Sequence, residues 1–258
     1  MLLARALNLS RDGLLLKSKS AMCSTDVVME YNSLIYTRQQ DVPIAYILGQ
    51  QEFWSLPFAV DKHTLIPRPE SELLVELAVE HLEHLSPKDL INVLDLGTGS
   101  GCLLLALLNT APSIFAGIGV DISYEALRVA KRNAKDLNLE HRAHFVVSNW
   151  LDGINGNHRY EVIVCNPPYV TNNEWLTLSD QVKNYEPKNA LTDHADGLTY
   201  YRELAHKLGP ALTQTGIAIL ECGHTQAEEV ARIMDDGGRA TLRFVKDLAG
   251  IDRALIIR

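Results

Sequence analysis

Four residues that could hold a flat, nitrogen-bearing group follow the apolar stretch VIVC: Asn166, Pro167, Pro168 and Tyr169. Two consecutive prolines lack the N–H groups of a strand ladder, so the chain must leave the strand in a stiff turn. The Asn166 side-chain oxygen and the Pro167 carbonyl then offer two acceptors for the hydrogens of an NH₂ group. They would hold the nitrogen and favour its pyramidal, charge-bearing form in a transition state, while Tyr169 packs against the flat group. The same residues also suit an ordinary strand-ending loop.

A glycine-rich turn lies 65 residues or more upstream, in NVLDLGTGSGCLLLAL. It spans Gly97, Thr98, Gly99, Ser100 and Gly101, and glycines there allow positive φ and close approach of a ligand to the backbone. The dinucleotide fingerprint GxGxxG would need glycine where this chain has Cys102. The pattern is instead GxGxG preceded by an acid, which is the form associated with S-adenosylmethionine methyltransferases.

Asp121 ends the next predicted strand, and Trp150 follows the strand after that one. A carboxylate at the end of a strand can accept hydrogen bonds from both hydroxyls of an adenosine ribose. Trp150 could stack on the adenine or wall it off. The alternatives are an acidic helix cap for Asp121 and a core or rim aromatic for Trp150. Because the carboxyl ends of parallel strands share one edge of a sheet, Gly97, Asp121 and Asn166 are expected to converge on one crevice.

The elements that must position these residues alternate between strand and helix from residue 91 onward, which predicts a parallel sheet covered on both faces. Apolar spacing before residue 42 predicts short helices, and residues 43–61 read as a β-hairpin or extended linker. A helix is expected to begin near Pro69, and the last two strands are expected to pair antiparallel at the edge of the sheet. The predicted strands are INVLDL, FAGIGVD, HFVVS, YEVIVC, IAILEC, TLRFVKD and RALIIR; the predicted helices are SGCLLLALLNT, SYEALRVAKRNAKDLNL, GLTYYRELAHKLGPAL and QAEEVARIMDDG.

Composition narrows the class of partner. The 258 residues carry a formal net charge of −8, which argues against unaided binding to a long nucleic-acid duplex. The basic run KRNAK reads as the solvated face of a helix. Four cysteines without CxxC spacing predict free thiols in a reducing compartment, and no histidine cluster has zinc spacing. The apolar run CLLLALL is too short to span a membrane and the N-terminus does not resemble a secretory signal, so a cytoplasmic protein is expected.

Several segments together resemble the release factor glutamine methyltransferase family (PrmC, also called HemK). They are EFWSLPFAVDKHTLIPRPESELLVE, VLDLGTGSGC, NPPYV, NYEPKNALTDHADGLTYYREL, ILECG and VKDLAGIDRALIIR, and they cover nearly the whole chain from about residue 40. The resemblance implies an α/β fold with a seven-stranded Rossmann-like class I methyltransferase sheet. It also implies three parts: a short N-terminal helical domain (residues 1–42, apparently truncated), a β-hairpin linker (43–61) and a methyltransferase domain (62–258).

The resemblance further implies a function. A methyl group passes from S-adenosyl-L-methionine, leaving S-adenosyl-L-homocysteine, to the side-chain N5 of the glutamine in the Gly-Gly-Gln motif of class-1 peptide chain release factors. Residues 97–101, Asp121, Trp150 and Asn166 would bind the cofactor, and residues 166–169 the glutamine, with no metal. Arg68 and Glu186 are expected near the substrate, although a supporting salt bridge or helix cap is an equal alternative. The family often has Asp where this chain has Asn149.

Two other functions use the same features. A DNA or RNA adenine-N6 methyltransferase has the same NPPY sequence, but it must extrude a base and grip the strand. The chain has no basic target-recognition insert, and its acidic balance opposes that reading. A catalytically silent S-adenosylmethionine-binding regulator is the second alternative, against which Asn166 and Tyr169 argue. The expected enzyme is a monomer that does not bind nucleic acid or membrane directly.

Overall fold

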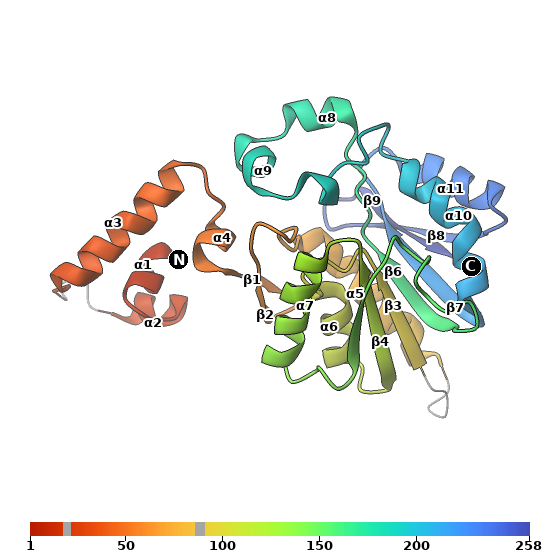
Figure 1. The fold of residues 1–258 in the computed structure, drawn as a ribbon, viewed down its shortest axis with the longest axis horizontal. Coiled ribbons are helices and arrows are strands. Elements are labelled where there is room, and N and C mark those ends of the chain that lie inside the picture. Colours follow the sequence, from red (N-terminus) through yellow and green to blue (C-terminus); the bar gives the residue numbers. More distant parts are fainter. Residues whose placement is uncertain (18–21, 86–90) are drawn as a thin grey trace.

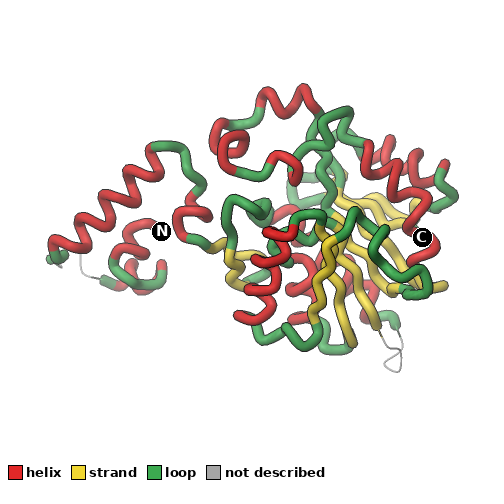
Figure 2. Tube along the Cα trace, viewed as in Figure 1, coloured by secondary structure: helices red, strands yellow, loops and turns green. Residues whose placement is uncertain are grey.

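The computed structural model describes residues 1–17, 22–85 and 91–258, and its centre is a seven-stranded sheet (Figures 1 and 2). The strand order is β5-β4-β3-β6-β7-β9-β8, with parallel pairing from β5 to β7 and antiparallel pairing of β9 with both neighbours. The strands are β3 (Ile91–Leu96), β4 (Ile114–Asp121), β5 (Ala143–Val147), β6 (Tyr160–Cys165), β7 (Leu212–Glu221), β8 (Thr241–Lys246) and β9 (Asp252–Ile257). The predicted sheet and its antiparallel edge are confirmed, and β9 lies between β7 and β8.

Helices cover both faces of this sheet and enclose two apolar cores. Successive residues of a strand point to opposite faces. In β6, therefore, Val162 and Val164 join one core, whereas Ile163 and Cys165 join the other. This two-sided burial explains why the central strands are continuous apolar runs rather than alternating ones. One face carries α5 (Glu72–Glu83), α6 (Cys102–Thr110) and α7 (Tyr124–Asp136); the other carries α10 (Thr199–Ala211) and α11 (Ala227–Asp236).

The N-terminal part consists of helices followed by a two-stranded hairpin. The helices are α1 (Leu2–Ala6), α2 (Arg11–Leu16), α3 (Thr25–Gln39) and α4 (Ile44–Leu48), and the hairpin is β1 (Gln50–Phe53) with β2 (Leu56–Ala59). The stretch predicted as hairpin or extended linker thus begins with a short helix, α4, which ends at Gly49 in the left-handed conformation. The hairpin turns at Trp54 and Ser55, both at positive φ, as a two-residue turn of the I′ kind requires.

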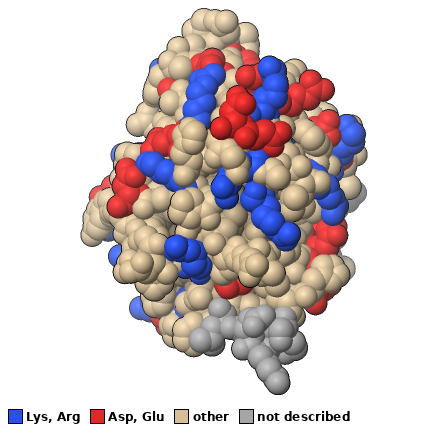
Figure 3. Space-filling model, turned by 90° about the vertical axis from the view of Figure 1, so that its right-hand side faces the viewer, with Lys and Arg blue, Asp and Glu red and all other residues tan. Residues whose placement is uncertain are grey.

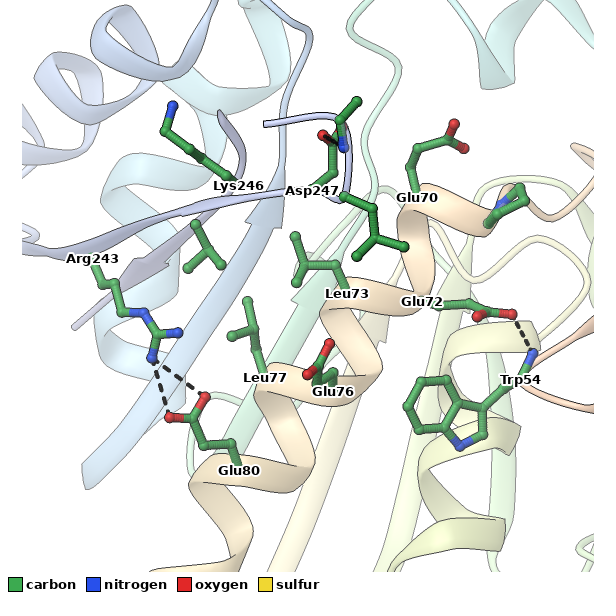
Figure 4. A pocket seen from close by; sticks show the side chains of 14 residues that line it. Trp54, Glu70, Glu72, Leu73, Glu76, Leu77, Glu80, Arg243, Lys246 and Asp247 are labelled. Atoms are coloured by element: carbon green, nitrogen blue, oxygen red, sulfur yellow. Dashed lines mark hydrogen bonds and ion pairs between the residues drawn. The ribbon is translucent and has the colours of Figure 1, made fainter. Parts of the chain in front are cut away.

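Helix α5 bonds both to the hairpin and to β8, the strand at one edge of the sheet, as Figure 4 shows. The Trp54 backbone N–H donates to Glu72 Oε1 at 2.7 Å, near the start of α5. Close to the other end of the helix, Glu80 pairs with Arg243 of β8 at 3.2 Å. Trp54 Nε1 also donates to Thr110 at the end of α6. The hairpin therefore sits against the helical layer next to α5 and α6.

The segment between β6 and α10 contains short helices that are not among the predicted ones. They are α8 (Asn172–Thr177), α9 (Asp180–Tyr185) and η2 (Lys188–Ala190). Earlier in the chain, the short helix η1 (Pro69–Ser71) leads into α5, close to Pro69 where a helix was predicted to begin. Thr171 and Glu174 close a capping box at the start of α8. Within the described ranges, no helix is long and apolar enough to cross a membrane. The domain boundaries at residues 42 and 61 stay a prediction.

Candidate active site

The glycine turn, the end of β4 and the end of β6 meet at one edge of the sheet. β3 pairs with β4 on one side and with β6 on the other, so the residues after these strands emerge together. They line a cavity of about 290 Å³, whose walls include Gly97, Asp121, Trp150, Asn166 and Pro168. The convergence expected from the strand order is therefore present in the structure.

The glycine turn is shaped by backbone that only glycine adopts without strain. Gly97, Gly99 and Gly101 have φ of +74°, +55° and +81°. A Cβ on Gly101 would also lie 3.2 Å from the Ala130 side chain of α7. Beneath the turn, the Thr98 hydroxyl donates to the fully buried Asp95 at 2.6 Å. Burial raises the pKa of Asp95 to about 7, against the opposing hydrogen bonds from Thr98 and Leu104.

Asp121 ends β4 with its carboxylate turned toward this turn. Oδ2 accepts the Gly99 N–H at 2.9 Å and Oδ1 accepts the Ser123 N–H at 2.8 Å. Each carboxylate oxygen can accept a further hydrogen bond, so both remain able to bind hydroxyl groups from the cavity. Burial raises the pKa of Asp121, and the backbone N–H groups of Ser123, Gly99 and Ile122 oppose that rise. The carboxylate thus fixes the turn and also faces the cavity.

Asn166 is oriented by residues that sequence reasoning missed. Its Nδ2 donates to Ser71 Oγ at 3.0 Å, and Ser71 donates to Glu221 Oε2 at 2.6 Å. Among the described residues no donor is paired with Asn166 Oδ1 or with the Pro167 carbonyl. Both predicted acceptors are therefore uncommitted. Ser71 precedes α5 and Glu221 ends β7, and neither position had a local signal beyond its place in a segment shared with the family.

Tyr169 is turned inward rather than toward solvent. Its hydroxyl donates to Glu221 Oε1 at 3.1 Å, and its ring packs against the core on the α10 and α11 side. Burial, followed by the charge of Glu221, raises the pKa of this phenol far above its ordinary value. Its backbone carbonyl accepts from Gln226 Nε2 at 3.0 Å. The NPPY turn is therefore held in place by Glu221, at the end of β7, and by Gln226, in addition to its covalent connection to β6.

Trp150 forms one wall of the cavity together with residues from the segment before α10. It is 8% exposed, contacts Tyr200 at 5.1 Å between ring centroids, and has a buried Nε1 without a partner among the described residues. Asn189 and His194 complete this wall, joined by a 2.9 Å contact. Sequence reasoning assigned neither of them a role. Asn149 donates to Asp152 and Glu203, so its amide is held at the rim by two acids.

Arg68 and Glu186 form a partly buried ion pair at 2.6 Å. Glu186 is 5% exposed, and its second oxygen accepts the Ile66 N–H at 3.1 Å. Both carboxylate oxygens therefore bind the segment that precedes η1. Arg68 lines a small neighbouring cavity of about 50 Å³ together with Ser71, the glycine turn and Asn166. This geometry favours a role in which the pair holds the wall of the site.

The basic run KRNAK is only partly the solvated surface that the sequence suggested. Its Lys and Arg side chains are exposed, but Asn133 is 1% exposed. Asn133 bonds the Ala59 N–H at 2.7 Å, the Ala59 carbonyl at 3.0 Å and the Ser100 carbonyl at 2.8 Å. The reading was wrong for this residue because its partners lie far away in sequence. Asn133 fastens the glycine turn to the hairpin.

A larger groove of about 550 Å³ lies elsewhere, between α5 and the β8–β9 connection (Figure 4). It is lined by Glu70, Glu76 and Glu80 of the α5 region, by Lys246 of β8 and by the apolar Leu77 of α5. It contains no residue of the glycine turn or of NPPY. Volume alone would point to this groove, but the free acceptors and the positive-φ turn are in the smaller cavity, which we take as the candidate active site.

Two family profiles match the chain. The one described as Methyltransferase small domain matches residues 74–182, and the one described as PrmC N-terminal domain matches residues 1–49. Among solved structures, a methyltransferase from Pyrococcus furiosus has a TM-score of 0.57 at 14% identity, over 88% of this chain and 95% of that one. A ribosomal protein L11 methylase from Lactobacillus delbrueckii subsp. bulgaricus has a TM-score of 0.52 at 18% identity, over 74% and 79%. At these identities the solved structures support the fold alone.

Sequence relatives are more specific. A release factor glutamine methyltransferase from Fusobacterium nucleatum is 39% identical over 87% of this chain, which spans 62% of that relative. Proteins of the same description from Rhodospirillum rubrum and Agrobacterium fabrum are 38% and 39% identical over 95% and 88% of this chain, and the matches cover 74% and 78% of their lengths. The chain belongs to the release factor glutamine methyltransferase family.

Proposed function

We propose that this protein transfers a methyl group from S-adenosylmethionine to the side-chain N5 of the glutamine in the Gly-Gly-Gln motif of class-1 peptide chain release factors, in support of translation termination. The observation that carries the proposal is the uncommitted pair of acceptors at Asn166 Oδ1 and the Pro167 carbonyl, at the edge of a cavity that also contains Asp121. Membership of the family, together with the names of its members, supports glutamine as the group they hold.

The cavity fits S-adenosylmethionine. Gly97, Gly99 and Gly101 supply open backbone at positive φ, and a Cβ on Gly97 would lie 3.6 Å from the Trp150 ring and narrow the cavity. Asp121 would hold the ribose hydroxyls. Trp150 also lines the cavity, and its buried Nε1 is a donor that has no partner among the described residues. When bound, the cofactor supplies an activated methyl group on a sulfonium.

The chain itself contributes positioning and electrostatics. A planar amide nitrogen is a poor nucleophile because its lone pair is delocalised. Asn166 Oδ1 and the Pro167 carbonyl would accept hydrogen bonds from the glutamine NH₂, which aligns the nitrogen and favours its charge-bearing form. The Pro-Pro turn keeps this carbonyl in place, and the Glu221 and Gln226 contacts hold Tyr169 beside it. The Arg68–Glu186 pair would hold the wall on the substrate side.

A nucleic-acid adenine methyltransferase is the weaker alternative. The net charge of −8 opposes binding to a polyanion. On the face drawn in Figure 3, Lys and Arg side chains are interspersed with Asp and Glu rather than gathered into a single basic surface. These observations support a protein substrate.

The free thiols of Cys165 and Cys222, both buried, support a reducing, cytoplasmic setting, and we take the enzyme to be a monomer.

One labelling experiment tests the function. The enzyme and radiolabelled S-adenosylmethionine are incubated with a class-1 release factor, with its Gly-Gly-Ala variant, and with double-stranded DNA. We expect label on the wild-type release factor alone. Label that persists on the Gly-Gly-Ala variant, or that goes to DNA, would contradict the proposal, and a complete lack of label would favour a silent binding protein.

A further inference from the structure

We infer that Ser71 and Glu221 are positioning residues that decide which atom of the Asn166 side chain faces the substrate. The inference deepens the proposed function and rests on it where substrate turnover is concerned. It stands on a hydrogen-bonded chain of three residues. Asn166 Nδ2 donates to Ser71 Oγ at 3.0 Å, and the Ser71 hydroxyl donates to Glu221 Oε2 at 2.6 Å.

An asparagine side chain can present either its oxygen or its NH₂ to a site after a rotation of half a turn, because the two ends have nearly the same shape. Only the oxygen can accept a hydrogen bond from a substrate amide. If the Asn166 amide were turned over, its NH₂ group would face the NH₂ group of the substrate amide. The Pro167 carbonyl would then be left as the one acceptor of the pair. Something in the protein must therefore fix the rotation of Asn166.

Donor and acceptor counting shows how this is done. Both carboxylate oxygens of Glu221 act as acceptors, Oε2 from the Ser71 hydroxyl and Oε1 from the Tyr169 hydroxyl at 3.1 Å. The single proton of Ser71 is thereby committed to Glu221. Ser71 Oγ can then only accept from Asn166, so the NH₂ group must point to Ser71 and Oδ1 must point away from it. Ser71 and Glu221 are 3% and 1% exposed, which keeps water from replacing either partner.

The arrangement couples three remote parts of the chain. Ser71 ends η1, Asn166 follows β6, and Glu221 ends β7, with 95 residues separating Asn166 from Ser71 and 150 separating Ser71 from Glu221. The Tyr201 hydroxyl, from α10, also donates to the Glu221 backbone carbonyl at 2.6 Å and fixes the end of β7. The rotation of one catalytic side chain is thus set by the assembled fold.

Glu221→Gln and Ser71→Ala test the inference by kinetics. In Glu221→Gln the new NH₂ group can donate to Ser71, which frees the Ser71 proton to bond Asn166 Oδ1 and turn the amide over. We expect kcat for release factor methylation to fall about 100-fold, with KM and cofactor affinity within about threefold of wild type. Tyr160→Phe, which removes a buried hydroxyl at the opposite end of β6, is the matched control and should keep wild-type kcat.

A second readout needs no substrate. In protein labelled with ¹⁵N-asparagine, the side-chain amide signals of Asn166 are assigned by their loss in Asn166→Ala. We expect them to exchange slowly with solvent in the wild type and faster, at shifted positions, in Ser71→Ala and Glu221→Gln. Unchanged amide signals, or an unchanged kcat in folded variants, would overturn the inference. A wild-type enzyme that leaves the release factor unlabelled would instead count against the proposed function, while the amide signals would still decide the orientation.

Discussion

At the scale of single residues, Asn166 and Asp121 are each held by hydrogen bonds that leave them able to accept another one from a ligand. Asn166 uses its NH₂ on Ser71 and leaves Oδ1, and Asp121 uses one acceptor position per oxygen on the backbone. The remaining capacity of these two side chains is to accept hydrogen bonds, which suits a ligand that brings hydroxyl and amide hydrogens. Residue substitutions should therefore separate cofactor binding from transfer.

Asn166→Ala is expected to abolish transfer and largely spare cofactor binding, because it removes an acceptor for the substrate amide. Cofactor affinity is measured by isothermal titration calorimetry and transfer by labelling of the release factor. Equal loss of both would show that Asn166 serves mainly cofactor binding or folding.

Asp121→Ala is expected to weaken cofactor binding by about 1–3 kcal/mol, the cost of leaving buried hydrogen-bonding groups unpaired. Calorimetry measures the change. Asp136→Ala, which removes an exposed carboxylate at the end of α7, is the control. An affinity that does not change in Asp121→Ala would refute the ribose assignment.

Asp95→Asn is expected to alter how stability depends on pH. The folded protein raises the pKa of Asp95 from 3.8 to about 7, so it retains a proton that the unfolded chain has lost. Wild-type stability contributed by this group is fully present below the ordinary pKa and declines as pH rises to about 7. The free energy of unfolding of the variant, measured in urea, should therefore rise relative to wild type across this range. A pH-independent difference would contradict the expectation.

At the scale of elements, the site depends on contacts between the glycine turn, the hairpin and α7. Asn133 makes the bonds to Ala59 of β2 and to Ser100 of the turn from one buried side chain. Gly101 passes closely over Ala130 one turn earlier on the same helix. Helix α7 therefore sets the distance between the turn and the hairpin.

Asn133→Ala is expected to destabilise the fold by about 1–3 kcal/mol, because it leaves buried backbone groups of Ala59 and Ser100 without partners. Urea unfolding followed by circular dichroism measures the loss. Its exposed neighbour provides the control, since Arg132→Ala should change stability by less than about 0.5 kcal/mol. Equal stability of the two variants would show that the link between turn and hairpin contributes nothing.

At the scale of the whole molecule, the two apolar cores are formed by the sheet and its covering helices together with Phe53 and Phe58 of the hairpin, whereas α1–α3 lie to one side of them (Figure 1). Helix α3 has no buried residue, and α1 buries only Leu2, Ala4 and Ala6. The Tyr185 hydroxyl of α9 reaches the Gln40 carbonyl at 2.5 Å. Local stability should differ between these regions because they bury such different amounts of apolar surface.

Amide hydrogen exchange should show this difference. We expect the amides of α3 to exchange much faster than those of β3 and β6, which are buried on both faces. Mass spectrometry of peptides from the two regions measures the rates. Protection of α3 equal to that of the central strands would mean that the helix opens only when the whole molecule unfolds.

The sequence by itself determined the strands and covering helices of the large sheet and the edge of that sheet where the site forms. The predicted strands INVLDL and YEVIVC are β3 and β6 residue for residue, since two-sided burial leaves an unbroken apolar run. GxGxG and NPPY are equally local, because their effects on φ and on strand pairing act within a few residues. Parallel pairing then carries both motifs to one edge, where the cavity is found.

Only the tertiary structure decided which side chains meet there. Ser71, Asn133 and Glu221 bind partners far away in the chain, and a serine, an asparagine or a glutamate has no spacing that marks such a partner. For Glu186 the sequence left two readings open, and the structure aims both carboxylate oxygens at residues 66 and 68. The physical reason is that sequence periodicity encodes which face of an element is apolar, whereas a buried hydrogen bond depends on where remote elements come to rest.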